Sequence, residues 1–308
     1  NTLCQQLGDV PEFMWAARGV WVYYNVRADL DEALKLAERC MRLAERANVA
    51  EIVMEATYTL ACAHHFRGEF TQARPHFEAI LSLDRPDRDH STTMYTAMDV
   101  VATTCGLMSH TLWALGDTDA AFAQARRGIA VATELNHSLS HAFALYHLAC
   151  LEMFRGERHT VRAHADELLR LSEERGLFFV AQGFILRGWA TDSEEDVQRG
   201  LGIHYQSGSV LGQTFSLYAL ADVQRRTGRP DAALENIDAA LVAASATHEL
   251  WWDAELQRLR GEILIAQGKD AEAGQVLGDA RRTAERQQAP AFTARIEKTL
   301  QTLTASPR

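Results

Sequence analysis

Disulfide pairs, proline and positive charge are all scarce in this sequence of 308 residues, and each shortage excludes a class of protein. The cysteines are odd in number and form no CxxC motif, which favours buried thiols in a reducing compartment over a disulfide framework. They are Cys4, Cys40, Cys62, Cys105 and Cys150. Six prolines are too few for a disordered or linker-rich chain.

The formal net charge is −10, which disfavours binding to nucleic acid or to an anionic membrane, because polyanions attract basic surfaces. No uncharged apolar run reaches the roughly 18 residues that a membrane span needs. No basic segment followed by an apolar one stands at the N-terminus, so no secretory signal is visible. We therefore expect a cytoplasmic protein. Because the chain begins "NTLCQQLGDVPEF" without a methionine, we also expect a fragment of a larger multidomain protein.

The dominant positive feature is an internal repeat, which indicates a stacked architecture. Segments such as "FRGEFTQARPHFEAIL" and "RTGRPDAALENIDAAL" share a glycine followed, five positions later, by a small or apolar residue. A first unit fits around Ala28, and a weaker one fits around Asp192. The predicted turn positions are 28, 68, 116, 156, 192, 228 and 268, at intervals of 36 to 48 residues.

Each unit reads as two helices, since apolar residues recur at spacings of three and four on both sides of the turn. Strand signals are nearly absent. A two-helix unit must stack on its neighbours to bury its apolar stripe. We predict an all-α, right-handed α-solenoid of about seven helix-turn-helix repeats, with a capping helix over about 290–304. Residues 1–308 would form one solenoid domain.

Two places depart from the repeat. Pro75 falls inside the second helix of the second unit and predicts a kink or a late helix start. The fifth unit, "RGWATDSEEDVQRGLGIHYQSG", has a short second helix and four glycines. We expect the solenoid to be irregular or loosened around 191–212.

The repeat resembles the tetratricopeptide repeat. In the second unit, the positions of that family's signature are occupied by Leu60, Ala61, Gly68, Ala73 and Phe77. The segments "SLSHAFALYHLACLEMFRGE", "FILRGWA" and "ELWWDAELQRLRGEILIAQGKDAEA" resemble the C-terminal tetratricopeptide region of large bacterial signalling proteins. Those proteins carry an AAA-type ATPase domain, often with a class III adenylate/guanylate cyclase or a LuxR-type output domain. The resemblance implies a sensory or scaffolding arm, with ATPase or output domains attached in cis.

Catalytic and metal-binding motifs are missing. No GxxxxGK[ST] loop, GxSxG elbow or cysteine-protease signature occurs. Two histidine groups could ligate a metal, but neither has a second cluster nearby, so we expect no metal, no cofactor and no catalytic residue. These groups are Cys62, His64 and His65, and His137 and His141.

The tetratricopeptide register predicts a concave face lined by the first helix of each unit, at positions ten, six and three before the turn. Tyrosine recurs at one of these positions, and tyrosine and tryptophan suit binding surfaces. Alternatively, these aromatics fill a tightly wound superhelix. The predicted binding residues are Tyr58, Cys62, His65, His110, Trp113, Tyr146, Met153, Tyr218, Asp222 and Arg225.

The function that the sequence favours is a non-catalytic sensor or scaffold that binds a protein, a peptide or a small effector on the concave face. An assembly scaffold that forms a homodimer, without a ligand in the groove, is the alternative. A helical-repeat RNA binder is disfavoured by the net charge, and an enzyme has no motif in its support.

Overall fold

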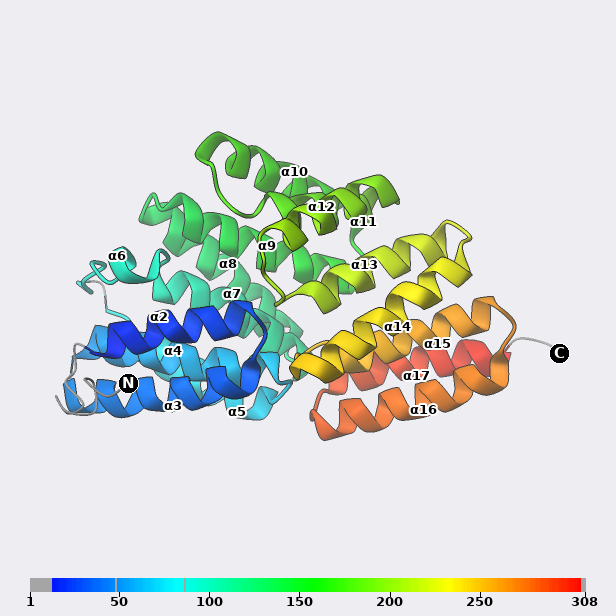
Figure 1. The fold of residues 1–308 in the computed structure, drawn as a ribbon, viewed down its shortest axis with the longest axis horizontal. Coiled ribbons are helices and arrows are strands. Elements are labelled where there is room, and N and C mark those ends of the chain that lie inside the picture. Colours follow the sequence, from blue (N-terminus) through cyan, green and yellow to red (C-terminus); the bar gives the residue numbers. More distant parts are fainter. Residues whose placement is uncertain (1–12, 48, 86, 306–308) are drawn as a thin grey trace.

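The computed structural model describes residues 13–47, 49–85 and 87–305, and over these ranges it contains sixteen helices and no strand. Fourteen of the helices form seven consecutive antiparallel pairs (Figure 1). The pairs are α2 (Phe13–Val26) with α3 (Leu30–Ala47), α4 (Ala50–Phe66) with α5 (Phe70–Leu83), α7 (Val100–Ala114) with α8 (Thr118–Glu134), α9 (Ser138–Arg155) with α10 (Arg158–Arg175), α11 (Val180–Thr191) with α12 (Glu194–Gln206), α13 (Gln213–Arg226) with α14 (Pro230–Thr247), and α15 (Asp253–Ala266) with α16 (Asp270–Arg286). The last helix, α17 (Pro290–Ala305), packs on α15 and α16. The predicted all-α solenoid of seven helix pairs and a final helix is confirmed.

All seven predicted turn positions have left-handed backbone geometry. The φ angle is positive at the five glycines, and also at Ala28 (54°) and Asp192 (56°). Glycine enters this region without a steric penalty, which explains its recurrence between antiparallel helices.

The residues five positions after the turns are fully buried, as the close approach of paired helices requires. They are Ala33, Ala73, Ala121, Val161, Val197, Ala233 and Ala273.

The repeat has one insertion. The interval between the turns at 68 and 116 is the longest, and it contains the short helix α6 (Thr93–Thr96), which the periodicity did not predict. The insertion is fixed to the solenoid by Asp99, which accepts hydrogen bonds from the backbone N–H groups of Val101 and Ala102 at 3.0 Å and so caps α7. The same carboxylate binds Arg88 at 2.7 Å.

Helix α5 begins at Phe70 and runs through Pro75. The expectation of a late start is therefore wrong. Pro75 is the sixth residue of the helix, so the carbonyl that loses its hydrogen bond belongs to Thr71, in the exposed first turn. Water can solvate that carbonyl.

The superhelix closes on itself. The backbone carbonyl of Val26, at the end of α2, accepts from the N–H groups of Val210 and Leu211 at 2.8 and 3.1 Å. One unit later, Phe66 O accepts from Leu250 and Trp251 at the same two distances. The turns within the first and second units thus contact the loops that precede the sixth and seventh units. Helices α14–α17 lie beside the ends of α4 and α5 (Figure 1). We call these contacts the seam.

The fifth unit has short helices of 12 and 13 residues, and its glycines permit close packing. A Cβ atom on Gly200 would lie 2.6 Å from the carbonyl oxygen of Ala181 and 2.7 Å from Ile185. Gly202 lies on the same helix, and a Cβ there would meet nothing within 4 Å. At Gly200, therefore, the backbone of α12 lies close against α11.

Because backbone cannot move aside as a flexible side chain can, Gly200→Ala is expected to destabilise the protein by about 1–3 kcal/mol. Gly202→Ala, the matched control, should be neutral or stabilising by up to about 1 kcal/mol, because alanine is the better helix former. Urea denaturation of both variants measures the difference. Equal effects of the two substitutions would show that the helices do not approach closely at Gly200.

Candidate functional site

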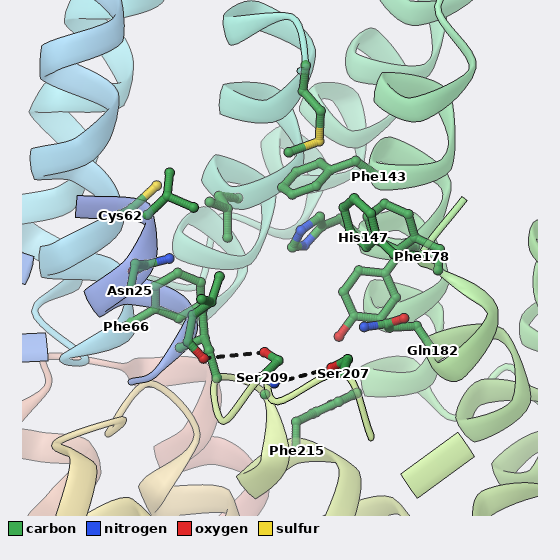
Figure 2. A pocket seen from close by; sticks show the side chains of 18 of the residues that line it. Asn25, Cys62, Phe66, Phe143, His147, Phe178, Gln182, Ser207, Ser209 and Phe215 are labelled. Carbon is green, nitrogen blue, oxygen red and sulfur yellow. Dashed lines mark hydrogen bonds between the residues drawn. The ribbon is translucent and has the colours of Figure 1, made fainter. Parts of the chain in front are cut away.

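A cavity of about 580 Å³ lies inside the superhelix. The first helices of the first six pairs all contribute to its wall, together with the segment 96–98, the loop 207–212 and the loop after α14. Figure 2 shows Asn25 and Cys62 on one side, Phe143 and His147 facing them, and Ser207 and Ser209 below. Seam contacts complete this enclosure, because they bring the loops 207–212 and 248–252 to the ends of α2 and α4.

Much of the wall is apolar and aromatic. Rings from six different segments line the cavity, and tyrosine and tryptophan add polar atoms to an apolar surface. The aromatic lining residues are Trp21, Tyr58, Phe66, Phe143, Tyr146, Phe178, Phe179, Phe215 and Trp251. Val22, Val26 and Phe178 line the cavity and are also exposed to solvent, so they mark its mouth. The site has the concave, apolar character of small-ligand pockets.

Two tyrosine–cysteine pairs repeat on equivalent helices. Tyr58 lies one turn before Cys62 on α4, and Tyr146 lies one turn before Cys150 on α9. Each thiol interacts with its tyrosine, and burial raises the pKa of Cys62 to about 12. Both thiols stay protonated at neutral pH, so neither is an activated nucleophile.

Three buried histidines form a cluster in the cavity wall. His65 Nδ1 is 2.8 Å from the Thr111 hydroxyl, and His110 Nε2 donates to the His147 carbonyl at 3.0 Å. Burial lowers the pKa of all three rings, that of His110 to about 4. The cluster is therefore uncharged at neutral pH and adds polar atoms to the wall without adding charge.

Glu249, in the loop after α14, is the one carboxylate that lines the cavity among the residues described. It is completely buried. Its Oε1 accepts from the Gly212 N–H at 3.0 Å and from the Trp251 indole N–H at 3.1 Å. Its Oε2 has no hydrogen-bond partner in the part of the chain that the structure covers. Burial raises the pKa of Glu249 to about 7.

The charged groups at the other end of the cavity are already paired. Arg18 lines the cavity from α2, and its Nε donates to Glu55 at 3.0 Å behind the wall. Burial raises the pKa of Glu55 to about 7, although Arg18 opposes this shift. Arg18 is thus engaged with its own counter-ion on the outer side of the wall.

A second, smaller cleft of about 230 Å³ lies towards the C-terminal units and is strongly charged. Trp189 Nε1 and Arg225 both donate to Asp222 at 2.8 Å. Behind the cleft, Glu255 is completely buried and accepts from Arg258 and Arg295 at 2.8 and 2.9 Å. Each arginine that lines the cleft is paired with a carboxylate, so the network holds the last units together.

An aromatic layer lies beside both cavities. Trp252 is buried and stacks on Phe154, with ring centroids 4.5 Å apart. Phe215 and Tyr218 pack edge-on against the same indole, at 5.6 and 5.4 Å. Of these rings, Phe215 lines the larger cavity, whereas Phe154 and Tyr218 line the smaller cleft. The repeat register predicts one continuous groove, whereas in the structure this layer lies between two separate sites.

The predicted concave residues fall into three groups. Five of them line the larger cavity: Tyr58, Cys62, His65, His110 and Tyr146. Four line the smaller cleft: Met153, Tyr218, Asp222 and Arg225. Trp113 lines neither; it is buried against Phe154, Trp252 and Phe292.

Sequence reasoning missed Glu249 and Trp251 as cavity residues. Both lie in the loop between the sixth and seventh units, outside the first helices on which the register is defined. The only signal was the unusual "ELWWD" segment itself.

The two histidine groups considered for metal binding have structural partners. His64 pairs with Glu69 at 2.6 Å, and His137 accepts from the Ser140 N–H and so caps α9. His141 lies 3.3 Å from the Thr133 hydroxyl. Within residues 13–47, 49–85 and 87–305, no three histidine, cysteine or acidic side chains are grouped so that they could hold a metal ion. Over the same residues, every helix is too short or too polar to span a bilayer.

Comparison of the sequence with known proteins gives a distant relative but no family. No profile of a known protein family matches the chain. An uncharacterized protein of Rhizobium meliloti (strain 1021) is 26% identical over 271 residues, which is 84% of this chain. The match covers 26% of that protein, so the chain spans about a quarter of the length of the curated relative it matches.

Two solved structures are similar along nearly the whole chain. One is a Rap protein complexed with competence and sporulation factor, with a TM-score of 0.55 and 11% identity, covering 95% of this chain and 99% of that one. The other is a plasmid-encoded Rap conjugation gene regulator in complex with the Phr* peptide, with a TM-score of 0.52, 9% identity and 96% of both chains covered. Identities this low establish a shared tetratricopeptide-like fold and nothing further.

Proposed function

We propose that the chain is a non-catalytic sensor domain that binds a small ligand or the end of a peptide inside its superhelix. The observation that carries this proposal is the cavity of about 580 Å³, whose aromatic wall includes buried polar atoms without partners among the described residues. Aromatic rings with a few convergent polar groups are the usual composition of a ligand site. A purely structural interior would instead satisfy its polar groups and close its voids.

Two similar solved structures support the binding of a ligand by this fold. Both are described as complexes, one with competence and sporulation factor and one with the Phr* peptide. In the present chain the cavity is lined by the first helices of six pairs.

The seam explains how binding would be transmitted. Each helix pair contacts mainly its neighbours, so a small change in the angle between pairs accumulates along the chain. A ligand that bridges α2 and α4 to the loops 207–212 and 248–252 would favour the closed superhelix. Binding would then shift the population between open and closed forms.

We further propose that residues 1–308 act as one regulatory arm of a larger cytoplasmic signalling protein, with ATPase, cyclase or DNA-binding output domains attached. The resemblance of the "ELWWD" region to such proteins supports this proposal. The curated relative also supports it, because the segment that matches this chain is 26% of that longer protein. The sequence of the complete gene product tests this second part.

A neutral dye tests the cavity as a binding site. We expect Nile red to bind wild-type protein saturably, at one molecule per chain, with a blue-shifted and enhanced emission. Ala181→Phe, which adds a phenyl ring to the wall, should weaken binding by about tenfold or more, since it fills the space that the dye needs. Ala181 is 3% exposed and lines the cavity.

Ala16→Phe, the same substitution at an exposed position of α2 outside the cavity, is the matched control and should bind like wild type. Thermal melts of both variants verify folding. Equal dye binding by the two variants would place the dye elsewhere and contradict the proposed site.

A further inference from the structure

One of the two charged residues that line the cavity is not paired with a charge of opposite sign in the part of the chain that the structure describes. Of the lining residues in the described ranges, only Arg18 and Glu249 carry a full charge at pH 8, because the four lining histidines are neutral. Arg18 is bound to Glu55. When Glu249 ionises, its negative charge has no counter-ion among the described residues. A buried, unpaired carboxylate is costly and is retained where it serves a purpose.

The groups around Glu249 are all uncharged. The loop 207–212 provides the Gly212 N–H, its own loop provides the Trp251 indole, and α13 brings the Thr214 hydroxyl close to the carboxyl. The Tyr146 phenol, from α9, interacts with this charge: burial raises the pKa of the phenol, and the negative charge of Glu249 adds to the rise. No lysine or arginine side chain of the described residues contributes to the charge environment of Glu249.

Aromatic rings stand next to this carboxyl. The Trp251 indole is held against Glu249 by its own N–H group, 3.1 Å from Oε1. The Phe215 ring lies 5.7 Å from the Trp251 ring. A carboxylate with aromatic rings nearby can recognise an ammonium group, through charge pairing with the carboxylate and cation–π attraction to a ring face.

The wall also has buried polar atoms without a partner among the described residues, both donors and acceptors. Trp21 Nε1 is a donor, and His65 Nε2 and His204 Nε2 can be either. Asn25 Oδ1 and Gln182 Oε1 line the same cavity, are buried, and have no partner among the described residues. Both are hydrogen-bond acceptors, as is Glu249 Oε2. An acidic ligand would find no unpaired cation among the described lining residues, because Arg18 is bound to Glu55.

We infer that the cavity recognises a protonated amine carried on an apolar or aromatic body, with the ammonium group against Glu249 and the body against the rings of the wall. This inference rests on the proposed function, since it names the class of ligand for the same cavity. The ammonium group can belong to a free amine or to the N-terminus of an apolar peptide.

Three probes with the same aromatic body test the inference at pH 8: phenethylamine, 2-phenylethanol and 3-phenylpropanoate. Calorimetric or tryptophan-fluorescence titration should give the amine an affinity about tenfold above that of the alcohol, and the carboxylate the weakest binding. Glu249→Gln should remove the preference for the amine and leave the alcohol unchanged. Glu262→Gln, in the smaller cleft, is the matched control and should keep the wild-type order.

A permanently charged probe isolates the protonation of Glu249. The affinity for benzyltrimethylammonium should rise by about tenfold between pH 6 and pH 8, because ionised Glu249 is the form that pairs with the cation. This rise should be absent from Glu249→Gln.

Two dipeptides distinguish the sources of the ammonium group. Binding of phenylalanyl-leucine amide, and its loss on N-acetylation, would assign the site to a peptide N-terminus. Binding of phenethylamine with no binding of the dipeptide would assign it to a free amine.

The outcomes separate this inference from the proposed function. If the alcohol and the amine bind equally well, or the carboxylate binds best, the inference is wrong and the cavity remains a binding site. If none of the probes and no Nile red binds, the proposed function itself fails.

Discussion

Trp252→Ala is expected to lower the free energy of unfolding by about 3–5 kcal/mol, because it removes a buried indole from the centre of the molecule. Trp252 is 1% exposed and touches rings from α9, α13 and α17, in addition to Trp113 on α7. These helices belong to three different units and the final helix. Loss of the indole should therefore loosen the contact between the two ends of the superhelix.

Urea denaturation followed by far-ultraviolet circular dichroism measures this change. Trp252→Phe keeps an aromatic ring and also removes an indole N–H that has no partner among the described residues, so it should cost less than the alanine variant. Tyr205→Ala, at a half-exposed ring, is the control and should change stability by less than about 1 kcal/mol. A loss below about 1.5 kcal/mol for Trp252→Ala would mean that the layer repacks around the missing ring.

Glu255→Gln is the second substitution with a large expected effect, and we expect a loss of about 3–5 kcal/mol at pH 7. The carboxylate is completely buried and binds Arg258 and Arg295. The amide keeps the shape of the side chain but leaves these two guanidinium groups without their shared counter-ion. Asp279→Asn, in an exposed pair with Arg282, is the control and should change stability by less than about 0.5 kcal/mol.

The difference in the free energy of unfolding between wild type and Glu255→Gln should depend on pH. Burial alone would raise the pKa of Glu255, but Arg258 and Arg295 outweigh burial, and the pKa lies below its ordinary value. A carboxyl with a lowered folded-state pKa stabilises the protein above the unfolded-state pKa of about 4.3 and loses this contribution as the pH falls through the folded-state value. The unfolding free energies of the two proteins should therefore converge as the pH falls. A constant difference from pH 7 to pH 3 would contradict the ion-pair explanation.

The local part of the fold could be predicted from the sequence because each repeat is specified by its own residues. Gly68 and the alanine five positions later, Ala73, fix one turn and one helix contact without reference to the rest of the chain. The same rule located the weaker turn at Asp192, where the backbone adopts the left-handed conformation without glycine. The helix α6 was missed because four residues show no periodicity.

The cavity could be predicted only in part, for the same reason. The register placed Tyr58 and His65 on the inner face, since it describes the orientation of each first helix. It gave no information on which units meet across the superhelix. Phe66 and Leu250 are 184 residues apart in sequence, and their hydrogen bond brings Glu249 into the site. Repeat periodicity describes contacts between neighbours and cannot specify a contact at that separation.

The seam also sets the order in which the site can form during synthesis. In an open solenoid every contact is local, so stacking can begin anywhere and proceed as the chain emerges. Here the wall of the cavity between α4 and the loop 248–252 requires hydrogen bonds from Phe66 to residues 250 and 251. The first two units can stack on each other early, but they cannot form this contact until the first six units have been synthesised. A chain that stops before residue 250 can build the helices of the cavity but cannot close it.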